Sequence, residues 1–330
     1  MEEQRKRART ITNTLIDGRA YIILAALMVV FIIIAPDFIN PINLLNLIKR
    51  QGFIAVAAFS ATFFITLGGL DLSTGSIAAL VGVSFALLMS RSFLVFLPVA
   101  IALPACIIIC LLIGAAAGFM NGFISVKGRI TPFLVTLATM NIFRSLAIVF
   151  SGGIEITVTS PVFITLFSTG WLFGVIPAPV VIVIIMFAAA WYLLERTKYG
   201  YYVKAVGGNP EAAMVSGIKV GKIRVLTYTI HGAFAALSGL MLTGLYRSGS
   251  PSAGMELSID AVAAVILGGT AIGGGNGKIW GTLAGILVLA VIINGMTIIG
   301  ALYDIQILVK GIVIILAVLL DNAINSRKRL

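Results

Sequence analysis

The sequence contains little charge, and this shortage excludes most soluble folds. Only 11% of its 330 residues are charged, whereas 60% are hydrophobic and the mean hydropathy is +1.11. An ordinary soluble domain is about 25% charged, so this chain lacks the polar side chains that would cover it in water. A lipid bilayer must solvate much of its surface, and the composition predicts a polytopic membrane protein.

Acidic residues and cysteines are also scarce. Twelve Asp and Glu stand against 23 Lys and Arg, which gives a formal net charge of +11. In a membrane protein such an excess usually lies in the cytoplasmic loops, so we expect no nucleic-acid partner. Cys106 and Cys110 lie one helical turn apart in an apolar run, which favours two small hydrophobes over a disulfide or a metal site.

The sequence lacks the motifs of an enzyme. The stretch "GGGNGKIW" (273–280) is similar to a phosphate-binding loop, but Ile272 and Ile279 stand where that loop needs Gly and Ser or Thr. Metal-ligand spacing is absent, and no nucleophile has an obvious base nearby. We therefore expect no cofactor, no ATPase site of its own and no enzymatic activity.

Ten segments approach the roughly 20 apolar residues that a membrane span needs. They are 20–36, 52–68, 74–91, 94–124, 131–151, 177–194, 225–246, 259–273, 279–301 and 304–321. The first is followed by Pro36 and Asp37 with no small-residue cleavage site, so we expect a retained span. In the overlong fourth, Pro98 and Pro104 suggest an outer re-entrant or kinked portion. The prediction is an all-α bundle of about ten helices with broken or re-entrant segments, and nine or eleven spans stay open because the eighth is short.

The basic residues indicate which loops face the cytoplasm. With an even number of spans and both termini inside, the inward segments hold most of the Lys and Arg, as the positive-inside rule requires. These residues are Arg5, Lys6, Arg7, Arg9, Arg19, Lys127, Arg129, Arg196, Lys198, Lys204, Lys219, Lys222, Arg224, Lys278, Arg327, Lys328 and Arg329. We expect one transmembrane domain over 1–330, with a membrane bundle at 20–321, a cytoplasmic loop at 195–224 and an external loop at 152–176.

The cytoplasmic loop contains the signals of a short helix over about 210–216. Asn209 suits the N-cap, Pro210 the first helical position, Glu211 the positive helix end, and Gly217 the position after the helix. One reading is an amphipathic helix on the membrane surface. Because its side chains are few and small, a compact knob that fits a groove on a cytoplasmic protein is the better interpretation.

The external loop is moderately apolar and rich in aromatic residues, namely Phe163, Phe167, Trp171 and Phe173. Such residues form belts at the membrane interface, and they also form docking surfaces for partners. The sequence leaves both readings open.

Asp71 stands in a polar stretch, "GGLDLSTGS" (68–76), between two apolar runs. Glycine-rich turns occur here and again in 267–285, and glycine permits sharp turns and close helix packing. Packing does not explain an aspartate, since a carboxylate inside a membrane is unfavourable. Asp71 either caps the third helix together with Ser73 or lies on the path of a polar substrate.

Arg144 is a charge well inside the fifth apolar run, "TLATMNIFRSLAIVF" (136–150). It must face the bundle interior, snorkel outward or pair, and Asp71 is a candidate partner. We place Thr136, Thr139 and Asn141 on the same helix face, where they would hydrogen-bond either a polyol or a neighbouring helix.

Three further polar residues lie in apolar runs. His231 is the single histidine of the chain, and without a ligand cluster it is best read as a satisfied interior hydrogen-bonding group. Asn121 and Asn294 have the same two readings, interior pairing or substrate contact. The full set of candidate path residues is Asp71, Ser73, Thr136, Thr139, Asn141, Arg144 and Asn294.

Several motifs occur together in order along most of the chain. They are "GGLDLSTGS" (68–76), "TPFLVTLATMNIFRS" (131–145), "AVGGNPEAAMVSGIKVGKI" (205–223), "SPSAG" (250–254), "IDAVAAVILGGTAIGGGNGKIWGTLAG" (259–285) and "VKGIVIILAVLLDN" (309–322). In these motifs the chain resembles the ribose/xylose/galactose-type permease subunits of bacterial ABC importers. The chain departs from the family pattern at two places, which bear on the identity of the sugar. Ser145 follows Arg144 where the family has Gly. The family's Glu-Leu-Asp before the eighth span is here "ELSID", so that Glu256 is shifted relative to Asp260.

The resemblance implies a multi-pass protein of the bacterial inner membrane that imports a pentose or hexose by alternating access. Its implied partners are a cytoplasmic ABC ATPase, an extracytoplasmic sugar-binding protein and a second permease copy or homologue. The residues that match the ATPase-coupling loop are Asn209, Pro210, Glu211, Ala212, Ala213, Ser216 and Gly217. An ion-coupled carrier with Asp71 as its buried carboxylate is the alternative function, and a membrane scaffold without transport is a second one.

Overall fold

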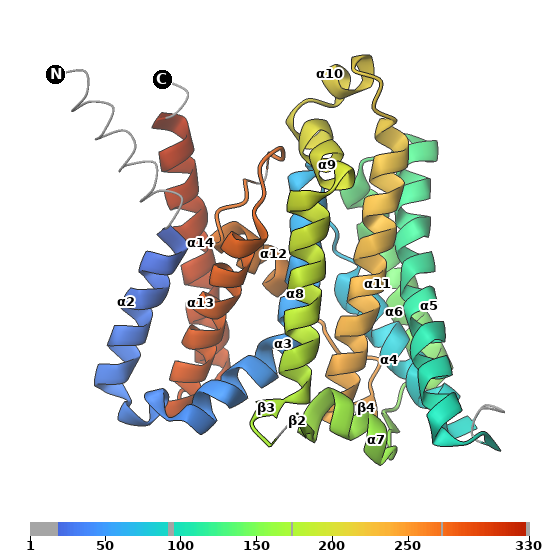
Figure 1. Cartoon of the computed structure of the whole chain (residues 1–330), viewed down its shortest axis with the longest axis vertical. Coiled ribbons are helices and arrows are strands. Elements are labelled where there is room, and N and C mark those ends of the chain that lie inside the picture. Colours follow the sequence, from blue (N-terminus) through green and yellow to red (C-terminus); the bar gives the residue numbers. More distant parts are fainter. Residues whose placement is uncertain (1–18, 92–95, 173, 272, 328–330) are drawn as a thin grey trace.

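The computed structural model describes residues 19–91, 96–172, 174–271 and 273–327, and this part of the chain is almost entirely helical (Figure 1). The membrane-length and shorter apolar helices are α2 (Arg19–Ile34), α3 (Pro41–Thr66), α4 (Thr74–Arg91), α5 (Val99–Gly128), α6 (Pro132–Ser151), α8 (Ala178–Arg196), α11 (Val220–Tyr246), α12 (Leu257–Leu267), α13 (Ile279–Ile298) and α14 (Tyr303–Arg327). The connecting elements are η1 (Pro36–Ile39), β1 (Ile156–Thr157), α7 (Pro161–Ile164), η3 (Thr165–Thr169), β2 (Trp171–Leu172), β3 (Ile176–Pro177), α9 (Lys198–Gly208), α10 (Pro210–Val215) and β4 (Ser248–Gly249).

A helix lies at each of the ten predicted segments. Six helices within the described ranges, α3, α5, α6, α8, α11 and α13, are long and apolar enough to cross a membrane. The apolar parts of α2, α4 and α12 are shorter, and α12 has only 11 residues. The polytopic helical class is thus confirmed, whereas the count of ten spans stays a prediction.

The helices α5 and α3 differ from the segments predicted for them. The helix α5 runs without a break over 30 residues, with Pro98 as its N-cap and Pro104 inside it, so the expected re-entrant portion is absent from the described part of this segment. The helix α3 begins at Pro41, well before residue 52, because the side chain of Asn40 accepts a hydrogen bond from Ile42 N at 3.0 Å and caps the helix there.

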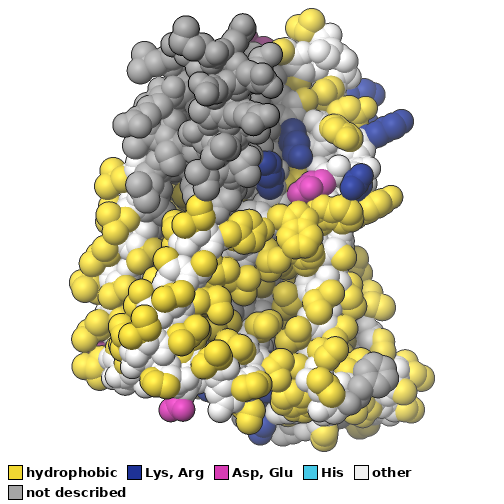
Figure 2. Space-filling view, turned by 60° about the vertical axis from the view of Figure 1, so that its left-hand side comes forward, with side chains coloured by type: hydrophobic (Ala, Val, Ile, Leu, Met, Phe, Trp, Pro, Cys, Tyr) yellow, Lys and Arg dark blue, Asp and Glu magenta, His cyan; other side chains and the backbone are white. Residues whose placement is uncertain are grey.

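The two ends of the bundle differ in content. The start of α2 and the end of α14 lie at the same end as α10, while α7 and the β-strands lie at the opposite end (Figure 1). Hydrophobic side chains cover most of one face, and the Lys and Arg in view gather mainly above them, at the α10 end (Figure 2). The cytoplasmic placement of both termini stays a prediction, and Arg5, Lys6, Arg7, Arg9, Lys328 and Arg329 lie outside the described residues.

The helix α11 lies at the centre and packs against α3, α4 and α5. Its contact with α5 is close because both helices carry glycine at the crossing, Gly114 and Gly118 on α5 and Gly232 on α11. A side chain at Gly118 would collide with the carbonyl oxygen of Tyr228. Small residues let two helix backbones approach in a membrane, so these glycines serve packing.

The external loop folds over the end of the bundle instead of forming a free aromatic surface. Phe163 is fully buried and stacks on Phe85 at 4.1 Å between ring centroids, and Phe167 is 4% exposed. Both expected readings, belt and docking surface, are therefore wrong for these two rings. Trp171 is 48% exposed, and Phe173 lies outside the described residues.

Candidate functional site

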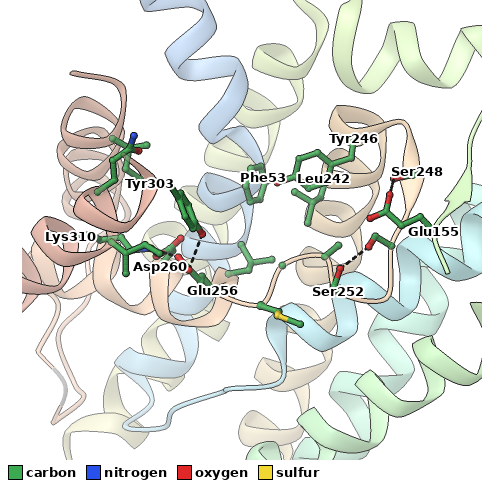
Figure 3. A pocket seen from close by; sticks show the side chains of 18 residues that line it. Phe53, Glu155, Leu242, Tyr246, Ser248, Ser252, Glu256, Asp260, Tyr303 and Lys310 are labelled. Atoms are coloured by element: carbon green, nitrogen blue, oxygen red, sulfur yellow. Dashed lines mark hydrogen bonds and ion pairs between the residues drawn. The ribbon is translucent and has the colours of Figure 1, made fainter. Parts of the chain in front are cut away.

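A cavity of about 690 Å³ lies at the end of the bundle that carries β4. We call it the outer cavity. Its lining residues are Phe53, Glu155, Leu242, Tyr246, Ser248, Ser250, Ser252, Ala253, Gly254, Met255, Glu256, Leu257, Asp260, Ile293, Tyr303, Gln306, Ile307 and Lys310 (Figure 3). Concave sites of this size with an apolar wall and a few polar groups are typical of small-molecule binding.

One end of the outer cavity contains an ion-paired cluster that joins α12 to α14. Lys310 Nζ lies 2.5 Å from Glu256 Oε2 and 2.8 Å from Asp260 Oδ1. Tyr303 donates its hydroxyl proton to Glu256 Oε1 at 3.1 Å. The side chains of Lys310 and Asp260 are only 10% exposed, so each charge needs the other to be tolerated there. The hydrogen bond from Lys310 is also the main cause that lowers the pKa of Glu256 below its ordinary value.

The other end of the outer cavity presents hydroxyl groups and a third carboxylate, of Glu155. Ser248 donates to Glu155 Oε2 at 3.2 Å, and the hydroxyl oxygens of Ser250 and Ser252 lie 2.9 Å apart. The pairing of β1 with β4, in which Thr157 faces Ser248, brings Glu155 to this position. No local pattern in the sequence predicts the contact between Glu155 and Ser248, which lie 93 residues apart.

The sequence did contain a signal for the ion-paired cluster. Asp260 is the single charge of α12, and Lys310 is the single charge between Asp304 and Asp321 of α14, which is a mark of a functional or paired group. The alternative of an ion-coupled carrier named Asp71 as its buried carboxylate, but Asp260 is buried as well.

Asp71 belongs to a second polar group, which we call the break network. It consists of Ser60, Asp71, Ser73, Thr74, Asn121 and His231, each at most 1% exposed, and none of them lines the outer cavity. Asp71 Oδ1 accepts hydrogen bonds from Ser73 N at 2.7 Å and from Ser73 Oγ at 2.6 Å, just before α4 begins. These bonds fold a turn in front of α4, whereas Gly75 N in the first turn of α4 donates to Ser258 Oγ at 3.1 Å, so the capping reading of Asp71 and Ser73 stays a prediction.

The imidazole of His231 connects three helices within the break network. Its Nδ1 lies 2.8 Å from Ser60 Oγ on α3, and its Nε2 lies 2.8 Å from Thr74 Oγ1 on α4. Asp71 Oδ2 is 3.8 Å from the same Nε2, and Asn121 donates to Ser73 Oγ at 2.8 Å. His231 and Asn121 thus make the interior pairings that the sequence suggested as one reading.

The predicted polar face of α6 is only partly correct. Thr136 Oγ1 accepts a hydrogen bond from Leu72 N at 3.3 Å, and the buried Thr139 donates to Thr136 O at 3.3 Å. Asn141 is exposed and donates to Leu137 O of its own helix. Asn141 lies five residues after Thr136, and at 3.6 residues per turn its side chain points about 140° away from that of Thr136. Thr136, Thr139 and Asn141 therefore do not share a helix face.

Arg144 and Asn294 have partners other than those expected. Arg144 Nη1 donates to Pro251 O at 2.6 Å and to Ala253 O at 2.8 Å, so it supports the "SPSAG" loop beside the outer cavity and does not pair with Asp71. The amide groups of Asn294 and Asn43 exchange two hydrogen bonds at 2.9 and 3.0 Å. For Asn294 this favours helix pairing over substrate contact.

The short helix predicted within 195–224 forms where it was expected. Asn209 Oδ1 accepts a hydrogen bond from Ala212 N at 2.9 Å, and Gly217 has φ +85° after the helix. Ala213 is buried, whereas Val215 is 90% exposed at the tip. Sequence reasoning missed α9, which precedes α10 and connects it to α8.

Three glycine-rich segments meet beneath α10, and we call this contact the glycine junction. Gly275 N donates to Thr66 O at 2.7 Å, which joins the loop before α13 to the end of α3. A side chain at Gly207, near the end of α9, would collide with the same Thr66 oxygen, and one at Gly274 would lie 3.0 Å from the backbone of Gly68. The two glycine-rich turns seen in the sequence therefore touch each other.

Comparison with known proteins gives a consistent result over nearly the whole chain. Residues 43–318 match the family described as the permease component of the branched-chain amino acid transport system. The chain is 38% identical to the ribose import permease protein RbsC of Haemophilus influenzae over 321 residues, which cover 96% of this chain and 97% of the relative.

Two further relatives extend this likeness. The chain is 40% identical over 297 residues to the ribose import permease protein RbsC of Bacillus subtilis, with 90% and 89% of the two chains covered. It is 33% identical over 324 residues to the galactose/methyl galactoside import permease protein MglC of Escherichia coli, with 95% and 96% covered. No solved structure matches the chain.

Proposed function

Because the chain belongs to the family of permease components that includes the ribose and galactose import permeases, we propose that it is the transmembrane subunit of an ABC importer for a pentose or hexose. The family and its apolar helices make it a multi-pass protein of the bacterial inner membrane. The proposal assigns it transport by alternating access, with no chemical step in this subunit.

The observation that carries ATPase coupling is the shape and exposure of α10. This helix stands at one end of the bundle, with Met214 63% and Val215 90% exposed at its tip. Six residues are too few for a stable membrane-surface helix, because isolated short helices are marginal. A rigid knob capped by Asn209 and closed by Gly217 suits a groove on a cytoplasmic ATPase. The coupling residues we propose are Asn209, Pro210, Glu211, Ala212, Ala213, Ser216 and Gly217.

The glycine junction offers a mechanical route from α10 to the transmembrane helices. A displacement of α10 acts on α9, and the end of α9 touches Thr66 at the end of α3 and Gly275 before α13. Glu195 Oε1 at the end of α8 accepts a hydrogen bond from Ile279 N, which adds a second tie to α13. Close backbone contacts transmit movement with little slack because packed interiors are not compressible.

The opposite end of the bundle would then face the sugar-binding protein. The outer cavity lies at that end, and a second copy or a homologue of this chain would complete the transporter. Capture by the binding protein means that this subunit needs only weak affinity for the sugar, since a tight internal site would slow release.

The experiment that tests the proposal measures uptake of labelled pentoses and hexoses into vesicles that contain the complete transporter. Glu211→Arg reverses the charge in the first turn of α10, and we expect it to abolish uptake together with co-purification of the ATPase. Asp304→Arg, a charge reversal at the opposite end, is the matched control and should retain both. Uptake that persists without ATP and follows an ion gradient would overturn the proposal.

A further inference from the structure

We infer that the outer cavity is the site where this subunit receives its substrate, and that the cavity accepts an uncharged polyhydroxy ligand and rejects an amino acid. The inference rests on the proposed function and adds the location and chemical selectivity of the site. The family is described by branched-chain amino acid transport, whereas the relatives from Haemophilus influenzae and Bacillus subtilis are ribose import permeases, so the two substrate classes are real alternatives.

The charges that line the outer cavity disfavour binding of an amino acid. An amino acid needs a free cation for its carboxylate and a carboxylate for its ammonium group. Among the described residues that line the cavity there are three carboxylates, of Glu155, Glu256 and Asp260, and one ammonium group, of Lys310. Lys310 is already held by two of these carboxylates at 2.5 and 2.8 Å. An incoming carboxylate would find its one cation neutralised and would face net negative charge.

The same groups suit a sugar. The carboxylate of Glu155 and the partly exposed carboxylate of Glu256 accept hydrogen bonds from hydroxyl groups, and Ser252 and Tyr303 both donate and accept. In Figure 3 these polar groups stand on two sides of the cavity, with Phe53 and Leu242 between them. An apolar wall between two polar rims matches a pyranose or furanose ring, which has an apolar C–H face and hydroxyls around its edge.

The place and openness of the cavity suit transient occupancy. Ser248 of β4 lines the cavity, and β4 lies at the end of the bundle opposite α10, where a binding protein would release its sugar. At about 690 Å³ it exceeds one monosaccharide, so bridging waters would complete the contacts and keep the affinity low.

Thiol modification in the complete transporter tests the inference without relying on ATPase coupling. Ser252→Cys places a reactive thiol in the outer cavity, and Cys106 and Cys110 are buried. We expect a cationic methanethiosulfonate to react about tenfold faster than an anionic one of similar size, because a negatively charged cleft concentrates cations. D-ribose or D-galactose at a concentration equal to its Kd should slow the reaction about twofold by mass action, and L-leucine should not slow it.

Two matched variants locate the effect. Thr169→Cys, at the same end of the bundle but outside the cavity, should show neither the charge preference nor sugar protection. In the Ser252→Cys background, Glu155→Gln should reduce the preference for the cationic reagent, while Asp304→Asn, outside the lining, should leave it unchanged.

The outcomes separate the two proposals. Vesicles that import sugar while neither sugar protects the introduced thiol would overturn the cavity inference and leave the proposed function standing. Protection by L-leucine would overturn the selectivity. Vesicles that import leucine and no sugar would overturn the proposed function itself.

Discussion

The break network and the outer cavity are two polar groups inside one apolar bundle, and they differ in access. The break network is closed: its six residues are at most 1% exposed and bond mainly to one another. The outer cavity is open, and the side chain of Glu256 is 40% exposed even though it pairs with Lys310. Both groups carry charge at positions where lipid-facing charge would be intolerable.

The different access of the two groups shows that a polar residue in a membrane helix does not by itself mark a binding site. Asp71 was one of the candidate path residues in the sequence, yet it bonds Ser73 in front of α4 and does not line the outer cavity. Lys310, which was not among the candidate residues from the sequence, lines the outer cavity. Access to a ligand, and not polarity alone, separates a binding group from a structural one.

The largest expected effect comes from Lys310→Met, which breaks the ion-paired cluster of the outer cavity. The change leaves Glu256 and Asp260 without their cation, and removing one partner of a buried pair costs about 3–5 kcal/mol. We expect the free energy of unfolding to fall by about 3 kcal/mol, at the low end because Glu256 is 40% exposed. Thermal unfolding in detergent measures the loss.

A compensating variant sharpens this prediction. Lys310→Met combined with Glu256→Gln and Asp260→Asn removes the unpaired charges and should recover most of the stability. Lys127→Met, at an exposed lysine at the end of α5, should change it by less than about 0.5 kcal/mol. If the combined variant is no more stable than Lys310→Met alone, the pairing does not explain the loss.

A smaller loss is expected from Asp71→Ala in the break network. It leaves the amide and hydroxyl of Ser73 without their buried acceptor, and an unsatisfied buried group costs about 1–3 kcal/mol. We expect a loss near 2 kcal/mol for alanine and a smaller one for Asp71→Asn, which keeps an acceptor oxygen. Unfolding and the KM for uptake are measured on the same preparations, and KM should not change for Asp71→Asn. A normally folded Asp71→Asn protein without uptake would move Asp71 onto the transport path.

The smallest effect is expected from Asn141→Leu, which lies in neither region. Asn141 is exposed on α6 and bonds only within its own helix, so the substitution should alter stability by less than about 0.5 kcal/mol. Sugar uptake should keep its KM and rate in the vesicle assay. A raised KM would show that this face of α6 meets the substrate after all.

The parts of the structure that were predicted from sequence depend on local signals. The helix α10 formed as expected because its cap, its proline and its closing glycine lie within nine residues of one another. The ten apolar segments were found because hydrophobicity along a helix is read residue by residue. The family resemblance also rests on motifs that are contiguous in the chain.

The parts that were missed depend on contacts between distant residues. Arg144 bonds a carbonyl 107 residues away, and Tyr303 bonds Glu256 across 47 residues. The burial of Phe163 and Phe167 follows from the fold of the external loop over α4 and α11, which no local pattern announces. Asn141 was misplaced because a common polar character was taken for a common helix face.

The sequence by itself determined that this protein is a helical membrane protein of a permease family with a short capped helix in one loop, since composition, caps and motifs act locally. Only the tertiary structure decided which polar residues are sealed and which line a cavity. That distinction depends on how α3, α11, α12 and α14 pack, because the same buried charge is tolerated either by closing partners around it or by keeping it beside an open, hydrated space.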